Sequence, residues 1–196
     1  MNGYDPATAL LVVDVQNDFA DPNGNLYVVG GEQIVDPVNQ EVANAAAAGA
    51  TLVYTQDWHP PVTPHFQKDG GIWPVHCVAG TWGAEFHPHL VVRPEADVVR
   101  KGVGGEDGYS GFTVREPASG EEHGTGLEEI LRRRGVARVV VAGLATDYCV
   151  RETVLDALRL GFTATVLTEA VRAVDLQPGD GQRALEEIRA AGATLA

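Results

Sequence analysis

The sequence has little positive charge. Its 196 residues include 14 Lys and Arg against 27 Asp and Glu, which gives a net charge of −13 at pH 7. A protein that binds nucleic acid or an anionic membrane needs a basic face, so the composition argues against both partners. Lysine occurs only as Lys68 and Lys101, and Lys101 is notable because it directly follows an apolar segment.

Cysteine and long apolar runs are also scarce. Two cysteines, Cys77 and Cys149, are too few for a disulfide-stapled fold, and free thiols suit a reducing compartment. No apolar run is long enough to span a bilayer, and the first 19 residues carry no basic leader. We therefore expect a cytoplasmic protein with a small-molecule ligand.

The apolar residues instead form short continuous segments, which are typical of strands buried on both faces. These segments are Leu10–Val15, Thr51–Thr55, Asp97–Arg100, Arg138–Leu144, Thr163–Thr168 and, more weakly, Ala193–Ala196. Helical patterns that stop at glycine lie between several of them, over Gly31–Ala48, Gly126–Arg134, Asp147–Leu160 and Pro178–Ala191. The alternation predicts one α/β domain over residues 1–196, a three-layer fold whose mainly parallel six-stranded sheet carries helices on both faces.

Two irregular stretches interrupt this alternation, over Gln56–Ala96 and Gly102–Thr125. The first is rich in Pro, Gly, Trp and His and shows no clear helix. Long loops without secondary structure inside a compact domain are usually functional. We therefore expect both stretches to contribute to a site.

Polar side chains follow the ends of four predicted strands. Asp14 follows the first, the Asp57-Trp58-His59 run the second, Lys101 the third, and the segment leading to Cys149 the fourth. Ligands of open α/β sheets bind beyond the carboxyl ends of the strands. An acid, a base and a thiol are therefore expected to meet at one edge of the sheet.

Cys149 is expected in the first turn of a helix that Thr146 or Asp147 can cap. The free N–H groups and the positive end of the helix dipole favour a thiolate and could also hold an oxyanion. The residue could equally be a small buried core side chain. Position alone leaves both interpretations open.

Asp14 would be costly to bury without a partner, and Lys101 ends a strand that is plausibly its neighbour. The pair could be a structural ion pair. Together with Cys149 it could also form a catalytic triad, in which Asp14 takes the thiol proton and later acts as a general acid and base.

Asp57 and His59 are alternate residues of an extended segment, so their side chains point the same way, and His65 and His76 follow in the same stretch. Carboxylate and imidazole ligands suit one divalent ion, with zinc favoured and iron or manganese as alternatives. Solvated loop histidines are the plainer interpretation. The remaining histidines do not lie near other ligand-type residues in this way and are taken as surface or structural residues: His87, His89 and His123.

Aromatic residues also concentrate in the irregular segments. They could pack these loops down, or they could wall a pocket for a flat aromatic substrate. These residues are Phe19, Trp58, Trp73, Trp82 and Tyr109.

Seven motifs, in order along the chain, resemble those of nicotinamidases of the isochorismatase-like cysteine hydrolase superfamily. They are DVQNDF, DWHP, WPVHC, GAEFHP, RKG, DGYSGF and GLATDYCV, which together run from Asp14 to Val150. The resemblance implies hydrolysis of nicotinamide to nicotinate and ammonia, usually of pyrazinamide too, through a cysteine thioester. It also implies that the substrate's ring nitrogen binds the metal.

The same resemblance assigns roles to individual residues. It implies that Cys149 is the nucleophile, Asp14 the base and Lys101 the third member of the triad. It implies a cis peptide between Leu144 and Ala145, which would direct the Ala145 and Cys149 N–H groups to the oxyanion. The implied metal ligands are Asp57, His59 and His76, with His65 as a ligand that some members replace, and the implied ring-enclosing residues are Phe19, Trp73 and Tyr109.

Alternatives from other classes stay open. Another amide hydrolase of the superfamily, such as an N-carbamoyl amidase, would generally lack the Asp-x-His and downstream His. Isochorismatase itself acts on an ether bond and needs neither metal nor cysteine, and a non-catalytic binding protein would not need the triad. The stretches Gly104–Asp107 and Arg115–Thr125 depart most from the family pattern, and a homo-oligomer stays open.

Overall fold

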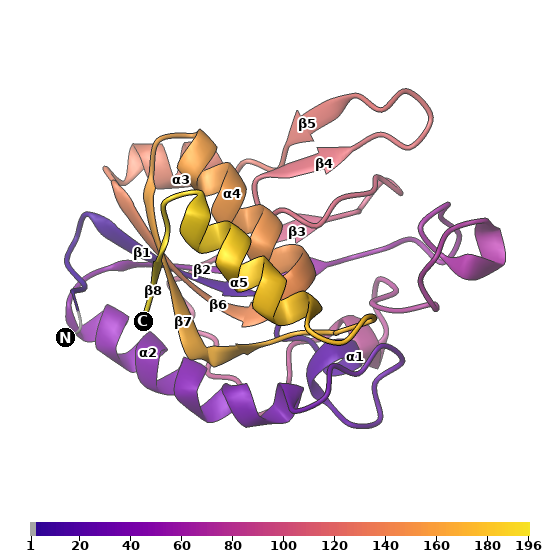
Figure 1. Cartoon of the computed structure of the whole chain (residues 1–196), viewed down its shortest axis with the longest axis horizontal. Coiled ribbons are helices and arrows are strands. Elements are labelled where there is room, and N and C mark those ends of the chain that lie inside the picture. The colour runs from indigo at the N-terminus through magenta and orange to yellow at the C-terminus, as the bar shows by residue number, and fades with distance from the viewer. Residues whose placement is uncertain (1–2) are drawn as a thin grey trace.

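A computed structural model describes residues 3–196. Its centre is a six-stranded sheet in which every neighbouring pair of strands is parallel, with the order β3-β2-β1-β6-β7-β8 (Figure 1). The predicted single-domain α/β fold with a mainly parallel sheet is therefore confirmed. The strands are β1 (Thr8–Val13), β2 (Thr51–Asp57), β3 (Asp97–Lys101), β6 (Arg138–Leu144), β7 (Thr163–Arg172) and β8 (Thr194–Leu195).

The strand ends differ from the sequence prediction in a way that matters for the site. The first strand was expected over Leu10–Val15, but β1 spans Thr8–Val13. Asp14 has a positive φ of 48°, so the backbone leaves the extended conformation there and Asp14 lies just past the strand. β2 and β3 end on Asp57 and Lys101, which pair in register.

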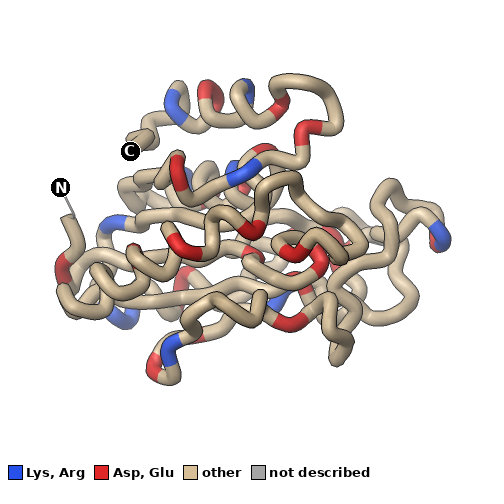
Figure 2. Tube along the Cα trace, turned by 90° about the horizontal axis from the view of Figure 1, so that it is seen from below, with Lys and Arg blue, Asp and Glu red and all other residues tan. Residues whose placement is uncertain are grey.

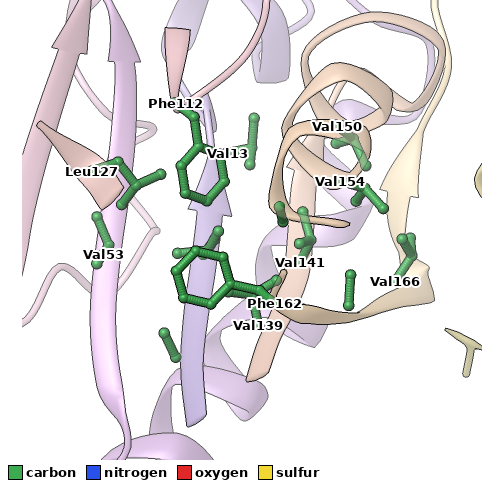
Figure 3. Packing of buried hydrophobic residues seen from close by; sticks show 14 of the residues in the cluster. Val13, Val53, Phe112, Leu127, Val139, Val141, Val150, Val154, Phe162 and Val166 are labelled. Carbon is green, nitrogen blue, oxygen red and sulfur yellow. The ribbon is translucent and has the colours of Figure 1, made fainter. Parts of the chain in front are cut away.

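Helices cover both faces of the sheet, as predicted. The helix α2 (Val35–Ala47) packs on one face, whereas α3 (Leu127–Arg133), α4 (Arg151–Arg159) and α5 (Asp180–Ala190) cover the other (Figure 1). β1 alternates its side chains between the two cores: Leu11 and Val13 face the α4 side, and Leu10 and Val12 face α2. Figure 3 shows Val13, Val141 and Val154 packed together in the first of these cores.

Several helices begin differently from the prediction. The segment expected to open α2 is a 3-10 turn, η1 (Gly31–Ile34), and the segment expected to open α4 is a π-helical turn, η4 (Thr146–Val150). A four-residue helix, α1 (Asn17–Ala20), was not predicted, because four residues are too few to show a helical repeat. This helix places Phe19 near the carboxyl ends of the strands.

The two irregular stretches contain little regular structure. Within Gln56–Ala96, after the last two residues of β2, lie only the 3-10 turns η2 (Gln67–Asp69) and η3 (Trp82–Ala84). Within Gly102–Thr125 lies an antiparallel hairpin of β4 (Thr113–Arg115) and β5 (Glu122–Gly124), which stands out from the main sheet and was not predicted (Figure 1).

Acidic residues are distributed over the whole trace rather than on one face (Figure 2). Within residues 3–196, none of the helices has the length and apolar character that crossing a membrane requires.

Candidate active site

Four polar side chains meet at the carboxyl edge of the sheet because their strands are consecutive neighbours. In sheet order, Lys101 ends β3, Asp57 ends β2, Asp14 follows β1, and Cys149 follows β6 in η4. All four are buried. Asp14, Asp57 and Cys149 each place a side-chain atom within 4.8 Å of the other two. The convergence expected from the sequence is present.

Lys101 is the cation at the centre of this group. Its Nζ lies 2.8 Å from Asp14 Oδ2 and 3.5 Å from Cys149 Sγ, and it donates a hydrogen bond to Asp57 Oδ1. Burial by itself would lower the pKa of Lys101, but Asp14 and then Asp57 outweigh it and hold the pKa well above its ordinary value. The ammonium group therefore stays charged.

Asp14 is held in place by Thr55 on the neighbouring strand. Thr55 Oγ1 donates to Asp14 Oδ1 at 2.6 Å and accepts from the Asp14 backbone N–H at 3.2 Å. Burial raises the pKa of Asp14, with Lys101 opposing the shift and Asp57 adding to it. A carboxylate with a raised pKa is a stronger base, as proton removal from a thiol requires.

Cys149 differs from the sequence expectation in its ionisation. Burial raises the pKa of its thiol well above the ordinary value; Lys101 opposes the shift, and Asp14 and Asp57 add to it. This raised pKa favours the neutral thiol at rest over the thiolate expected from the helix terminus. The two nearby carboxylates and the burial of the thiol raise its pKa more than the helix terminus lowers it. The thiol therefore needs a base at the moment of attack.

The predicted capping of this helix is also wrong. Ala145 is the N-cap residue, and no side chain caps the turn. The Asp147 carboxylate instead accepts hydrogen bonds from the backbone N–H groups of Val174 and Asp175, both at 2.9 Å. Asp147 thus fastens η4 to the segment after β7.

Three buried histidines form a second cluster next to Asp57. His59, His65 and His76 each place one ring nitrogen within 4.8 Å of the other two. Asp57 Oδ2 lies 3.7 Å from His59 Nε2 and 3.9 Å from His76 Nε2. Asp57 therefore joins the two clusters, with Oδ1 toward Lys101 and Oδ2 toward the histidines.

The side chains of this cluster fit a divalent metal ion. Both ring nitrogens of His59 are buried without a hydrogen-bond partner, an arrangement that is costly unless an ion uses one of them. His76 Nδ1 bonds to the Pro74 carbonyl at 2.7 Å, which leaves Nε2 with its lone pair, and burial lowers the pKa of His76 to about 4. The ring is therefore neutral, as a ligand must be.

Charge and space at the cluster agree with this fit. The buried carboxylates of Asp14 and Asp57 exceed the single ammonium of Lys101 by one negative charge, which a cation beside Asp57 would balance. Gly102 packs directly against His59: a Cβ there would lie 2.6 Å from His59 Nδ1, and its φ of +74° also favours glycine.

A pocket opens between the two clusters and is walled by aromatic rings. Trp73 Nε1 donates to Tyr109 Oη at 3.0 Å, and both rings stand edge-on to Tyr148, with centroids 4.9 and 5.2 Å away. The lining residues are Phe19, Leu26, Val28, Asp57, His65, Trp73, His76, Tyr109, Leu144, Ala145, Tyr148, Cys149 and Val174. Nearly all the residues predicted for the catalytic, metal and ring-enclosing roles therefore line or adjoin one pocket.

The backbone that leads to Cys149 has the conformation implied by the resemblance. The peptide between Leu144 and Ala145 is cis. Gly143, with φ of +121°, passes so close to β1 that a Cβ would lie 2.0 Å from the Val13 carbonyl oxygen. Only glycine fits at this position, where β6 runs directly beside the last residue of β1.

The family follows from comparison with known proteins. The model of the isochorismatase domain matches residues 8–196. The chain belongs to this family.

Several relatives of this isochorismatase-family chain are nicotinamidases or pyrazinamidases. It is 41% identical to the nicotinamidase of Escherichia coli K12 over 97% of this chain and 94% of that protein. The solved pyrazinamidase of Pyrococcus horikoshii in complex with zinc is 41% identical, with a TM-score of 0.88 over 97% of this chain and 99% of that one. The PnC1 structure from L. infantum in complex with nicotinate is 35% identical, with a TM-score of 0.87 over 98% and 94%.

Two aromatic residues predicted as pocket candidates lie elsewhere in this isochorismatase-family fold. Trp58 packs under Arg100, whose guanidinium lies 3.8 Å from the ring centroid, and Trp82 is half-exposed. Tyr148 lines the pocket but was missed, because its position beside Cys149 inside a predicted helix gave no sign of which way it faces.

The sequence analysis also missed two side chains that fix the backbone of the site by hydrogen bonds. Gln16 is fully buried; its Nε2 donates to the Asp57 carbonyl at 2.7 Å, and its Oε1 accepts from the Asp57 N–H at 2.8 Å. Asp18 accepts from the Cys77 N–H at 2.7 Å and so fixes the backbone next to His76. Both lie in the DVQNDF motif, which was the available signal.

Proposed function

We propose that the protein is a nicotinamidase that hydrolyses nicotinamide to nicotinate and ammonia, and pyrazinamide in the same way, with the help of one divalent metal ion. The carrying observation is that a cysteine and a cluster of metal-ligand side chains line one aromatic pocket, with a base and a cation directly behind the cysteine. The identities and structural likenesses to nicotinamidases and pyrazinamidases support the substrate class.

The pocket suits a flat ring with an amide at one end. Phe19 and the pair Trp73 and Tyr109 offer apolar ring surfaces, and Cys149 lies at the same pocket. An aromatic amide lying between these rings would place its carbonyl carbon within reach of Sγ. Positioning of this kind converts binding into a near-attack geometry.

The metal site is proposed to consist of Asp57, His59 and His76, with His65 as a further ligand, and zinc is the favoured ion. One carboxylate and two imidazoles leave a position free in a four-coordinate shell, and with His65 as a fourth ligand a free position would require a five- or six-coordinate shell. When bound, the ion supplies a Lewis-acidic position for the pyridine nitrogen of the substrate.

The protein's own groups carry the bond changes. Asp14 takes the Cys149 proton as Sγ attacks the amide carbon, and the backbone N–H groups of Ala145 and Cys149 hold the oxyanion. Asp14 returns the proton to the leaving nitrogen, ammonia departs, and a thioester remains on Cys149. Asp14 then takes a proton from the water that attacks the thioester, and returns it to the Cys149 sulfur as the C–S bond breaks and nicotinate leaves.

Lys101 has an electrostatic role in this proposal. Its Nζ lies within 3.5 Å of both Asp14 and Cys149. A fixed cation there stabilises the sulfur anion as the proton moves to Asp14. Its third contact, to Asp57, keeps that carboxylate ionised for the metal, as the lowered pKa of Asp57 indicates: burial acts to raise it, and Lys101 and His59 outweigh burial.

The deciding experiment measures ammonia release from nicotinamide by the zinc-loaded protein, with pyrazinamide and an N-carbamoyl amino acid in parallel. We expect turnover of the first two and little of the third. Turnover of the carbamoyl compound alone would favour the other amide hydrolase class. No turnover at all, with metal bound, would favour a binding protein. The cytoplasmic location and a homo-oligomeric state stay predictions.

A further inference from the structure

His65 differs from the other two histidines in how it is held. His59 lies two residues after β2, and its backbone pairs with the Cys77 and Ala79 segment, whereas His65 lies in the loop that leads to η2. The backbone N–H of His65 bonds to Thr63 Oγ1 at 3.3 Å, and its carbonyl accepts from the Trp73 N–H at 3.4 Å. A side chain in such a loop needs another contact to fix its ring.

Asp107 supplies that contact. His65 Nδ1 lies 2.7 Å from Asp107 Oδ1. An ionised carboxylate only accepts hydrogen bonds, so the proton of the neutral ring lies on Nδ1 and the lone pair on Nε2. The His65 side chain is buried, whereas that of Asp107 is half-exposed, so Asp107 reaches the ring from the solvent side.

His76 shows the same arrangement with a different acceptor. Its Nδ1 bonds to the Pro74 carbonyl at 2.7 Å, and its Nε2 faces Asp57 Oδ2 at 3.9 Å. Two of the three clustered histidines thus have Nδ1 occupied by an oxygen atom. Partners of this kind fix the tautomer and the ring orientation of metal-binding histidines.

Asp107 is itself fixed by a different part of the chain. Its backbone N–H donates to the Arg115 carbonyl at 2.8 Å, at the base of the β4–β5 hairpin. Two residues earlier, the Gly105 carbonyl accepts from Thr63 Oγ1 at 3.2 Å. The stretch Gly104–Asp107, which departs from the family pattern, therefore bonds twice to the loop that carries His65.

We propose that Asp107 is a positioning residue that holds His65 as the fourth metal ligand and thereby sets the metal affinity of this chain. This inference rests on the metal site of the proposed function but not on the substrate. It makes Asp107, within the Gly104–Asp107 stretch, a determinant of metal retention.

The test is a zinc-affinity measurement by competition with a chelator on the metal-free protein and its variants. Asp107→Ala should weaken zinc binding by about 10- to 100-fold, the usual effect of removing an outer partner of a ligand histidine. Asp107→Asn, whose amide oxygen can still accept from Nδ1, should lose less. Glu106→Ala is the matched control: it removes the adjacent carboxylate, which accepts from the Gly104 N–H within its own loop, and should leave the affinity within about twofold.

A double-mutant cycle separates positioning from simple charge attraction. If Asp107 acts through His65, then His65→Ala and the double variant His65→Ala/Asp107→Ala bind zinc equally weakly. The visible spectrum of the cobalt-substituted protein should change in the same direction in Asp107→Ala and His65→Ala, and less in Asp107→Ala, because that variant loosens the ligand that His65→Ala removes.

Unchanged zinc affinity in Asp107→Ala would overturn the proposal, as would an Asp107 effect that persists without His65. Neither result bears on nicotinamide turnover by the wild type. Conversely, a wild type that bound zinc through His65 but released no ammonia would reject the proposed function and leave the role of Asp107 intact.

Discussion

Lys101 Nζ lies 3.5 Å from Cys149 Sγ, although Lys101 ends β3, Cys149 follows β6, and the strands β2 and β1 lie between these two in the sheet. The lysine side chain crosses the ends of β2 and β1 and contacts Asp57 and Asp14 on the way. One cation thus links the residue that ends β3 to the thiol that follows β6. The predictions below test what this arrangement does.

Replacing Cys149 with alanine should abolish turnover of nicotinamide and leave the fold and the zinc content unchanged. The thiol is the covalent nucleophile of the proposed reaction, and removal of such a group normally costs several orders of magnitude. Ammonia release above about one per cent of the wild-type rate would reject the assignment.

Cys77 provides the matched control for that variant. It is fully buried, its Sγ contacts the Gly83 carbonyl, and it does not line the pocket. Cys77→Ser should keep most of the activity. A loss as large as that of Cys149→Ala would mean that the measurement reports folding and not chemistry.

Replacing Thr55 with valine should lower kcat at least about tenfold, with little change in KM. The variant leaves Asp14 Oδ1 buried without its donor, and a buried acceptor without a partner costs about 1–3 kcal/mol. Steady-state kinetics and urea unfolding measure the two effects separately.

Thr55→Ser restores the hydroxyl and should recover most of the kcat. Thr8→Val removes another buried hydroxyl, at the opposite end of β1, where it donates to Asp5. That control should leave kcat unchanged. If both valine variants reduced kcat alike, the effect would come from strand stability and not from the orientation of Asp14.

Replacing His59 with alanine should remove the metal and most of the activity on nicotinamide. Benzamide has the same shape without a ring nitrogen, so the wild type should hydrolyse it far more slowly, and this discrimination should shrink in His59→Ala. Metal analysis and the rate ratio for the two amides check this. Equal wild-type rates on both would show that the metal does not orient the ring.

The stability of the metal-free protein should fall as the pH drops below 6.5, partly because of His76. Burial lowers the pKa of His76 from 6.5 to about 4, so between these values the unfolded chain binds a proton that the native protein does not. This difference costs about 2.5 kcal/mol by pH 4.5 and nothing above pH 7.

His76→Asn cannot titrate, yet its amide can still donate to the Pro74 carbonyl. Its urea-unfolding free energy should therefore lose less between pH 7 and pH 4.5 than that of the wild type. His123→Asn, on the exposed strand β5, should keep the wild-type slope. Parallel pH profiles for wild type and His76→Asn would contradict the assigned pKa.

The sequence by itself determined the layers of the fold and the identity of the reactive side chains. Continuous apolar segments such as β1 must be buried on both faces of a sheet, and a glycine marks the end of each helix between them. This alternation of strands and helices predicted the parallel sheet. Asp14, Asp57 and Lys101 were placed at one edge because parallel strands bring their carboxyl ends together. The motifs then indicated the family.

Only the tertiary structure decided how these side chains act on one another. The order β3-β2-β1-β6 is not readable from the segments, yet it places both Asp14 and Asp57 beside Lys101, and Asp57 beside the histidines as well. The raised pKa of Cys149 has the same origin: a helix end acts locally, whereas burial beside Asp14 and Asp57 is a sum over distant parts of the chain. The bond from Asp107 to His65 joins residues 42 positions apart. No local sequence pattern encodes such a contact, because it depends on how the loops pack against one another in the folded protein.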